Sequence, residues 1–203
     1  MENDSGNIIR LYETYALDWD RERGRSLFEK PWLDKMLSLL PPGRSILDLG
    51  CGSGEPVARY FIDQGCVVTG VDTSSTLVGM CRDHFPDQNW LTADMRTLSL
   101  DRRFDGILGW DSLFHLRHDD QRQMFPIFRS HAAPGAALMF TSGPSHGEAI
   151  GTYKGERLYH ASLDQDEYWS LLDQNGFAVL SHVVQDLNCG DRTVWLAQRR
   201  FAS

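Results

Sequence analysis

Three glycines occupy alternate positions in residues 50–54, directly after a short apolar run that ends at Leu49. Glycine lets another molecule approach the backbone closely, and Pro56, which follows, is typical of the first turn of a helix. Free amide hydrogens at the start of a helix favour an anionic group. The stretch therefore predicts a nucleotide-binding turn between a strand and a helix, at the edge where open α/β sheets bind ligands.

Two carboxylates beside this turn narrow the ligand class. Asp48 lies two positions before the first glycine, where a negative charge suits a ligand that carries an ammonium group. Asp72 ends the next apolar run, where a carboxylate accepts the ribose hydroxyls of an adenosine. A dinucleotide-binding fingerprint that starts at Gly50 requires glycine at position 55, which Glu55 occupies. The structural alternatives are that Asp48 caps amides of the turn and that Asp72 caps the following helix.

Short apolar runs alternate with helical patterns along the chain. The expected strands cover 45–49, 66–71, 89–93, 105–110, 136–141, 177–186 and 193–198. Helical patterns fall at 8–19, 32–40, 55–64, 75–84, 119–132 and 165–174. Strands separated by helices imply a parallel sheet covered on both faces. We expect an α/β fold, a Rossmann-like doubly wound sheet of seven strands, mostly parallel with an antiparallel last strand.

The elements are expected to form a single domain, 1–203. The first two helices, which precede Pro41, form a helical cap over 1–43, and the ligand-binding core covers 44–200. Within the core, residues 142–164 form a connection that is long for a compact domain and contains aromatic residues and several glycines. We expect an irregular binding lid there, with a disordered loop as the alternative.

Four blocks, in this order and spacing, resemble the class I S-adenosylmethionine-dependent methyltransferases. They read LDLGCGSG at 47–54, GVD at 70–72, TADM at 92–95 and FDGILGWDSLFHL at 104–116. The resemblance extends over about residues 45–199 and implies S-adenosylmethionine as the cofactor. It also implies that the last strand lies antiparallel between strands five and six of the sheet.

The resemblance implies a set of cofactor contacts. The three glycines would lie along the methionine part, Asp72 would take the ribose hydroxyls, and Asp94 would accept from the adenine amino group. Tyr15 and Trp19 of the first helix would close over the cofactor, unless both are plain core residues. Turn chemistry is the alternative for Asp94, and a core position is the alternative for Trp110. The expected cofactor-binding residues are Asp48, Gly50, Cys51, Gly52, Gly54, Asp72, Thr73, Ala93, Asp94, Met95, Trp110, Tyr15 and Trp19.

Methyl transfer from a sulfonium is an in-line displacement, so the protein mainly aligns donor and acceptor and excludes water. A base is needed only when the acceptor atom carries a proton at neutral pH. We expect His160 in the lid as the base or orienting group, His115 as a second candidate, and Asp111 beside the sulfonium. A hydrogen-bonded structural role is the alternative for both histidines. Because only the cap and the lid remain to recognise an acceptor, we expect a small polar or amphipathic molecule.

The composition disfavours several other classes. A formal net charge of -8 and a pI near 5.3 repel nucleic-acid phosphates, and the basic pairs at 102–103 and 199–200 are expected to be solvated surface. The four cysteines lack zinc-ligand spacing, so no metal is expected. No apolar run has membrane-spanning length and no secretory signal begins the sequence, so we expect a cytoplasmic protein without a membrane partner.

Two other functions stay open at the level of sequence. A nicotinamide-dependent oxidoreductase is disfavoured by Glu55, because a carboxylate beside the glycine turn repels a pyrophosphate. A non-catalytic S-adenosylmethionine-binding protein would share every cofactor contact and lack turnover. The sequence does not indicate an oligomeric state.

Overall fold

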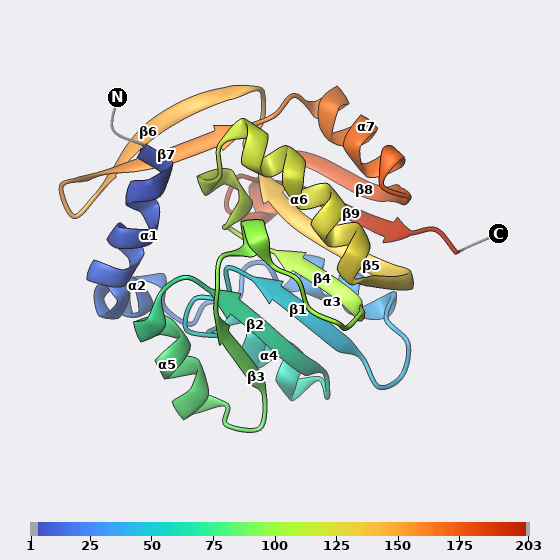
Figure 1. Ribbon diagram of the computed structural model, residues 1–203, viewed down its shortest axis with the longest axis horizontal. Helices are drawn as coiled ribbons and strands as arrows, with labels where there is room; N and C mark the ends of the chain where they lie inside the picture. Colours follow the sequence, from blue (N-terminus) through green and yellow to red (C-terminus); the bar gives the residue numbers. More distant parts are fainter. Residues whose placement is uncertain (1–3, 202–203) are drawn as a thin grey trace.

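The computed structural model describes residues 4–201, and the side chains of residues 6–201. Its centre is a seven-stranded sheet with the strand order β3-β2-β1-β4-β5-β9-β8 (Figure 1). The strands are β1 Ser45–Leu49, β2 Val67–Asp72, β3 Asn89–Thr92, β4 Phe104–Gly109, β5 Ala132–Ser142, β8 Phe177–Asp186 and β9 Arg192–Arg199. β9 lies between β5 and β8 and runs antiparallel to both, whereas the pairs from β3 to β5 are parallel. The predicted fold class is therefore confirmed, including the place of the last strand.

Helices cover both faces of this sheet. The helices that pack on it are α3 Lys30–Ser38, α4 Val57–Asp63, α5 Ser75–His84, α6 His118–His131 and α7 Gln165–Gln174. Because neighbouring strand residues point to opposite faces, Ile46 packs in the cluster that holds α3 and α4, and Leu47 in the one that holds α6 and α7. Figure 1 shows α6 and α7 on the near face of the sheet and α3 and α4 behind it.

The first predicted helix is broken in two at Tyr15. α1 spans Asp4–Thr14 and α2 spans Ala16–Arg23, and between them Tyr15 has φ -110° and ψ 22°, outside the helical region. The break lets the two helices face different neighbours, since α1 lies against β7 and α2 lies against α5. A periodicity of apolar residues does not reveal such a break, because both halves keep an apolar side.

The segment 142–164 is not irregular, and that prediction is wrong. β6 (Gly147–Tyr153) and β7 (Glu156–Ser162) form an antiparallel hairpin that is separate from the main sheet. Its two-residue turn is Lys154-Gly155, with φ of 51° and 82°, the geometry that twists in the same sense as the flanking strands. The hairpin projects beside α1 (Figure 1).

Three short 3-10 turns complete the described chain: η1 Met95–Thr97, η2 Leu113–His115 and η3 Leu187–Cys189. The first two follow β3 and β4, at the edge of the sheet where a ligand site is predicted. All four cysteines are buried free thiols. No helix within residues 4–201 is long and apolar enough to cross a bilayer, and the same residues hold no group of side chains arranged for a metal ion.

Candidate functional site

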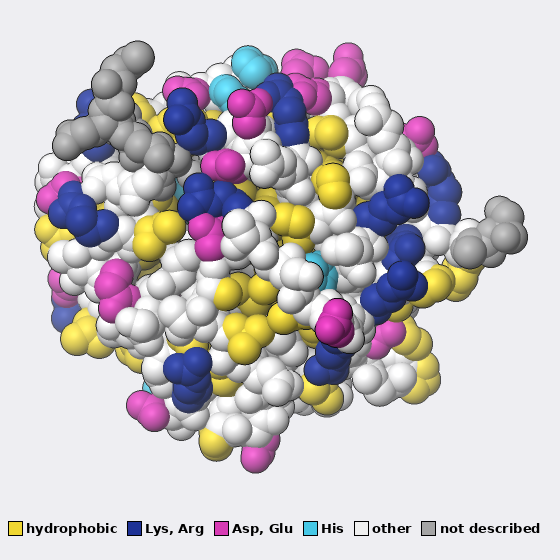
Figure 2. Space-filling view, viewed as in Figure 1, with side chains coloured by type: hydrophobic (Ala, Val, Ile, Leu, Met, Phe, Trp, Pro, Cys, Tyr) yellow, Lys and Arg dark blue, Asp and Glu magenta, His cyan; other side chains and the backbone are white. Residues whose placement is uncertain are grey.

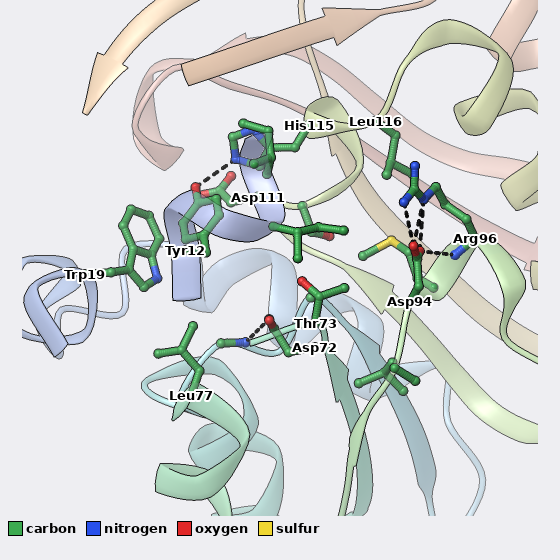
Figure 3. A pocket seen from close by; sticks show the side chains of 18 residues that line it. Tyr12, Trp19, Asp72, Thr73, Leu77, Asp94, Arg96, Asp111, His115 and Leu116 are labelled. Atoms are coloured by element: carbon green, nitrogen blue, oxygen red, sulfur yellow. Dashed lines mark hydrogen bonds and ion pairs between the residues drawn. The ribbon is translucent and has the colours of Figure 1, made fainter. Parts of the chain in front are cut away.

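A cleft lies at the carboxyl ends of β1, β2 and β4, under α1 and α2 (Figure 3). It has two adjoining parts that share Trp19, Gly50, Gly52 and Asp111. The predicted residues that line it are Trp19, Asp48, Gly50, Cys51, Gly52, Asp72, Thr73, Ala93, Asp94, Met95, Trp110, Asp111 and His115. Gly54, Tyr15 and His160 lie elsewhere.

The glycine turn is built for two purposes. Gly50, Gly52 and Gly54 have φ of 80°, 55° and 78°, a region that disfavours any side chain. A Cβ on Gly50 would lie 2.4 Å from Cβ of Ser112, and one on Gly54 would lie 2.9 Å from the Phe85 ring. Only at Gly52 does the missing side chain leave open space, with no atom nearer than 3.9 Å. Two glycines therefore serve internal packing, and Gly52 presents bare backbone to the cleft.

Asp72 is placed to receive two hydroxyl groups. Its two carboxylate oxygens accept the amides of Gly52 and Ser74, both at 2.9 Å, and the amide of Thr73 also acts on this carboxylate. Burial is the largest influence on this carboxyl and raises its pKa. Each oxygen keeps a further lone pair for a ligand, because a carboxylate oxygen accepts more than one hydrogen bond. The geometry fits the ribose contact that the family resemblance implies.

Two polar groups in the second part of the cleft have no partner in the described chain. Asp48 is 4% exposed, and burial, together with the charge of Asp72, raises its pKa to about 7. Its carboxylate accepts no hydrogen bond from residues 4–201, so the proposed capping role for Asp48 is not what the side chain does. Nε1 of Trp110 is also buried without a partner there. A ligand with a cationic group and an acceptor atom fits this pair.

Asp94 is already engaged by its own turn. Its carboxylate accepts the amide of Arg96 at 2.9 Å and pairs with the guanidinium of Arg96 at 2.6 Å, which also reaches Asp120 at 3.2 Å. The turn chemistry considered as the alternative therefore describes this side chain. Ala93 and Met95 still line the cleft on either side of it. Arg96 is a cleft residue that the sequence analysis did not identify.

Asp111, directly after β4, has φ 48°, an unusual conformation for a residue other than glycine. Its amide donates to Oγ1 of Thr141 at 2.9 Å, and its carboxylate pairs with Arg192 through Nη2 at 2.8 Å and Nε at 3.2 Å. Strained backbone beside a cleft is typical of a functional position. Because the guanidinium of Arg192 occupies the carboxylate, Asp111 is not a free base.

His115 forms two hydrogen bonds that define its protonation. Nδ1 lies 2.9 Å from the carbonyl oxygen of Tyr159 and must donate to it, so Nε2 accepts the hydroxyl of Tyr12 at 2.9 Å. Burial lowers the pKa of His115 to about 4, which keeps the ring neutral at neutral pH. The hydrogen-bonded structural role therefore describes His115, and Tyr12 is a cleft residue that the sequence analysis missed. Tyr12 belongs to the same apolar helical stripe as Trp19, and this spacing is the one sequence signal that could have identified it.

His160 lines a second cavity of about 320 Å³ under the β6–β7 hairpin, together with Phe114 and His146. Its ring centroid lies 4.9 Å from that of His115, which lines the cleft. The two histidine rings therefore stand between the cavity and the cleft. Burial lowers the pKa of His160, and the charge of Asp111 acts in the opposite sense.

Tyr15 also lies outside the cleft. Its ring meets the Tyr153 ring edge-on, with the ring centroids 6.0 Å apart.

The chain is similar to known proteins over most of its length. A family model described as a methyltransferase domain matches residues 19–182. Malonyl-[acyl-carrier protein] O-methyltransferase of Pseudescherichia vulneris is 34% identical over 99 residues, which cover 48% of this chain and 38% of that one. Ubiquinone biosynthesis O-methyltransferase of Coxiella burnetii is 32% identical over 108 residues, which cover 49% and 44%. The aligned part is thus less than half the length of either curated relative.

Solved structures share the fold. The 1,6-didemethyltoxoflavin-N1-methyltransferase of Burkholderia thailandensis, solved with S-adenosylhomocysteine, superimposes with a TM-score of 0.75 at 18% identity, covering 95% of this chain and 87% of that one. The resemblance to class I S-adenosylmethionine-dependent methyltransferases seen in the sequence is confirmed by the family match. The chain belongs to the methyltransferase domain family.

Proposed function

We propose that this protein transfers a methyl group from S-adenosylmethionine to a small polar or amphipathic molecule by in-line displacement. One observation carries the proposal: two features lie in the same cleft. The Asp72 carboxylate can still accept hydrogen bonds from a ligand, and the backbone of Gly52 is open to the cleft. A nicotinamide dinucleotide fits less well, because the turn lacks the glycine that the dinucleotide fingerprint needs at position 55. Glu55 lines the cleft there, paired with Arg59 at 2.6 Å.

Different residues of the cleft would bind different parts of the cofactor. Asp72 would hold the ribose, and the backbone of 93–95 would border the adenine. Gly52 would lie against the methionine part, whose ammonium group Asp48 favours. When bound, the cofactor supplies a methyl group on a positively charged sulfur. The contribution of the protein is alignment and the exclusion of water, for which Tyr12 and Trp19 lie over the cleft (Figure 3).

The acceptor would enter from the cavity under the hairpin. His160 stands between that cavity and the cleft, so it is placed to orient an acceptor or to take its proton. His115 remains the second candidate, although its two hydrogen bonds and low pKa make it a weak base. The hairpin would act as the lid of this acceptor site.

The wider setting is part of the same proposal. The net charge of -8 repels nucleic acids and anionic membrane surfaces. We therefore expect the acceptor to be a dissolved molecule in the cytoplasm. The relatives include O-methyltransferases, and the similar solved structures include an N-methyltransferase. They support the reaction class and leave the accepting atom open.

A binding experiment with Asp72→Ala tests the cofactor site. S-adenosylmethionine should raise the melting temperature of the wild type, and Asp72→Ala should weaken its affinity by about 1 to 3 kcal/mol, because hydrogen bonds to a charged acceptor are lost. Asp87→Ala, an exposed aspartate outside the cleft, is the matched control and should bind normally. Stabilisation by NADH but not by S-adenosylmethionine would overturn the proposal.

A second experiment separates an enzyme from a non-catalytic binder. Metabolite pools are screened for release of S-adenosylhomocysteine, first with the wild type and then with His160→Ala. We expect turnover with at least one pool, and slower turnover with near-normal cofactor affinity for the variant. Unchanged turnover on every responsive pool would remove His160 from the mechanism, and cofactor binding without any turnover would favour the binder.

A further inference from the structure

Glu13, near the end of α1, is bound to the start of α5 by four hydrogen bonds. One carboxylate oxygen accepts Oγ of Ser74 at 2.5 Å and the amide of Thr76 at 3.2 Å. The other accepts Oγ of Ser75 and Oγ1 of Thr76, both at 2.9 Å. All four donors are neutral, and the positive end of the α5 dipole adds to them. These bonds lower the pKa of Glu13 to about 2, so the side chain is a carboxylate at neutral pH.

The same turn holds the carboxylate predicted to take the ribose. Ser74 is fully buried, and its amide donates to Asp72 at 2.9 Å while its hydroxyl binds Glu13. That hydroxyl oxygen also accepts the amide of Leu77 at 3.2 Å and so caps α5. Glu13 and Asp72 are therefore connected through one residue, Ser74, which binds both carboxylates.

α1 and α2 together form a cover over the cleft, which we call the helical cover (4–23). Tyr12 and Trp19 of this cover stand across the cleft from Asp72 (Figure 3). Opposite the Glu13 contact, the cover is attached to the hairpin. Glu22 accepts the hydroxyl of Tyr153 at 3.0 Å and pairs with Lys154 at 2.5 Å. The cover is thus fastened on both sides of the cleft.

We propose that Glu13 is a positioning residue of the cofactor site. It acts through Ser74 on Asp72, and its contact with α5 holds the helical cover closed over the bound cofactor. Exchange of the cofactor then requires this contact to break. The inference rests on the proposed function, because it takes the cleft as the cofactor site.

The number of donors explains why a carboxylate is needed at position 13. Four donors match the lone pairs of two carboxylate oxygens, whereas a glutamine offers one oxygen and turns an NH2 group toward the remaining donors. Glu13→Gln should therefore retain part of the contact, and Glu13→Ala should lose all of it. The two variants form a graded series at one position.

Surface plasmon resonance with S-adenosylhomocysteine as the probe tests the proposal on the full chain. We expect Glu13→Ala to speed dissociation roughly tenfold or more, the size expected when hydrogen bonds to a charged acceptor are lost, with Glu13→Gln in between. Glu167→Ala is the matched control, because Glu167 pairs with Arg122 on the far side of the sheet from α4 and touches neither cover nor cleft. Circular dichroism checks that each variant is folded.

A double-mutant cycle distinguishes positioning from simple docking of α1. If Glu13 acts through Asp72, its removal should weaken binding much less in an Asp72→Asn background than in the wild type. Additive losses, or wild-type dissociation rates in both Glu13 variants, would overturn the inference. If Glu13→Ala does not fold, Glu13→Gln carries the same cycle. A wild type that binds neither S-adenosylhomocysteine nor S-adenosylmethionine overturns the proposed function, and the inference falls with it.

Discussion

Among single residues, Asp48 combines burial with a missing partner to an unusual degree. A carboxylate that is 4% exposed and accepts no hydrogen bond from the described chain is unfavourable unless it is protonated or meets a cation. A pKa of about 7 means that the folded protein carries this group partly protonated near neutral pH. Such an arrangement sacrifices stability for a site that receives a positive charge, as the ammonium and sulfonium groups of the proposed cofactor would supply.

Replacement of Asp48 by asparagine should stabilise the protein without ligand in a pH-dependent way. The unfolded chain releases this proton near pH 4 and the folded chain near pH 7, so the folded state binds more protons between them and stability falls as pH rises through that range. Asp48→Asn should therefore gain as much as about 4 kcal/mol near pH 8 and little near pH 4. Urea unfolding at the two pH values measures the gain, and an equal effect at both would contradict it.

The cleft residues were predictable to the extent that strand ends define them. The spacing of glycines and aspartates predicts that Gly52, Asp48 and Asp72 lie near one another, because the carboxyl ends of parallel strands share one edge, and all three line the cleft. Tyr12 and Arg96 were missed, since their roles depend on partners distant in sequence or on the local turn. Nothing local separates Gly54, which packs on Phe85, from Gly52, which faces the cleft.

Among the elements, the β6–β7 hairpin departs furthest from expectation. Its strands carry mostly exposed or half-buried residues, so the alternation of apolar and polar residues that reveals a strand is weak. Tyr159 and Ala161 are buried in a cluster with Ile8 of α1, and Ser162 at the end of β7 is buried as well. This hairpin decides where His160 lies, which explains why sequence reasoning named the residue but not its cavity.

The hairpin turn offers a test at this scale. Gly155 has φ 82°, so Gly155→Ala should strain the turn and destabilise the hairpin by roughly 1 kcal/mol. Trypsin should then cut faster at the neighbouring Lys154, because the loosened strands expose that bond. Gly79→Ala is the matched control, a glycine inside α5 with open space around it, and it should stabilise the protein by about 0.5 to 1 kcal/mol. Equal cleavage of both variants would contradict the proposed role of Gly155 in the hairpin turn.

At the scale of the whole molecule, the fold gathers basic residues that the sequence disperses. The basic pairs at 102–103 and 199–200 lie at the start of β4 and the end of β9, which meet at one edge because β9 is antiparallel. Burial lowers the pKa of Arg199, and the nearby charges of Arg103 and Arg129 lower it further. Figure 2 shows Lys and Arg side chains gathered on this side, beside the start of β5 in Figure 1.

These arginines lie at the edge of the sheet formed by the amino ends of the parallel strands, opposite the cleft, so they do not contribute to the proposed cofactor site. No carboxylate of residues 4–201 pairs with Arg103 or Arg129, whereas Arg21 pairs with Asp18. Their mutual repulsion disfavours the folded chain at low salt and is screened at high salt. The expectation that the basic pairs are solvated surface holds for Arg102, Arg103 and Arg200, which are exposed. Arg199 is half-buried and is repelled by Arg103 and Arg129.

Relief of this repulsion is a prediction about the whole chain. The double variant Arg103→Gln with Arg129→Gln should raise the melting temperature at low salt by a few degrees, for a gain of about 0.5 to 1 kcal/mol. Sodium chloride should stabilise the wild type more than this variant, since screening replaces what the substitutions remove. Arg21→Gln loses an attractive pair instead and should show no gain. A double variant that is less stable than the wild type at low salt would contradict this prediction, because the two guanidiniums would then stabilise the folded chain.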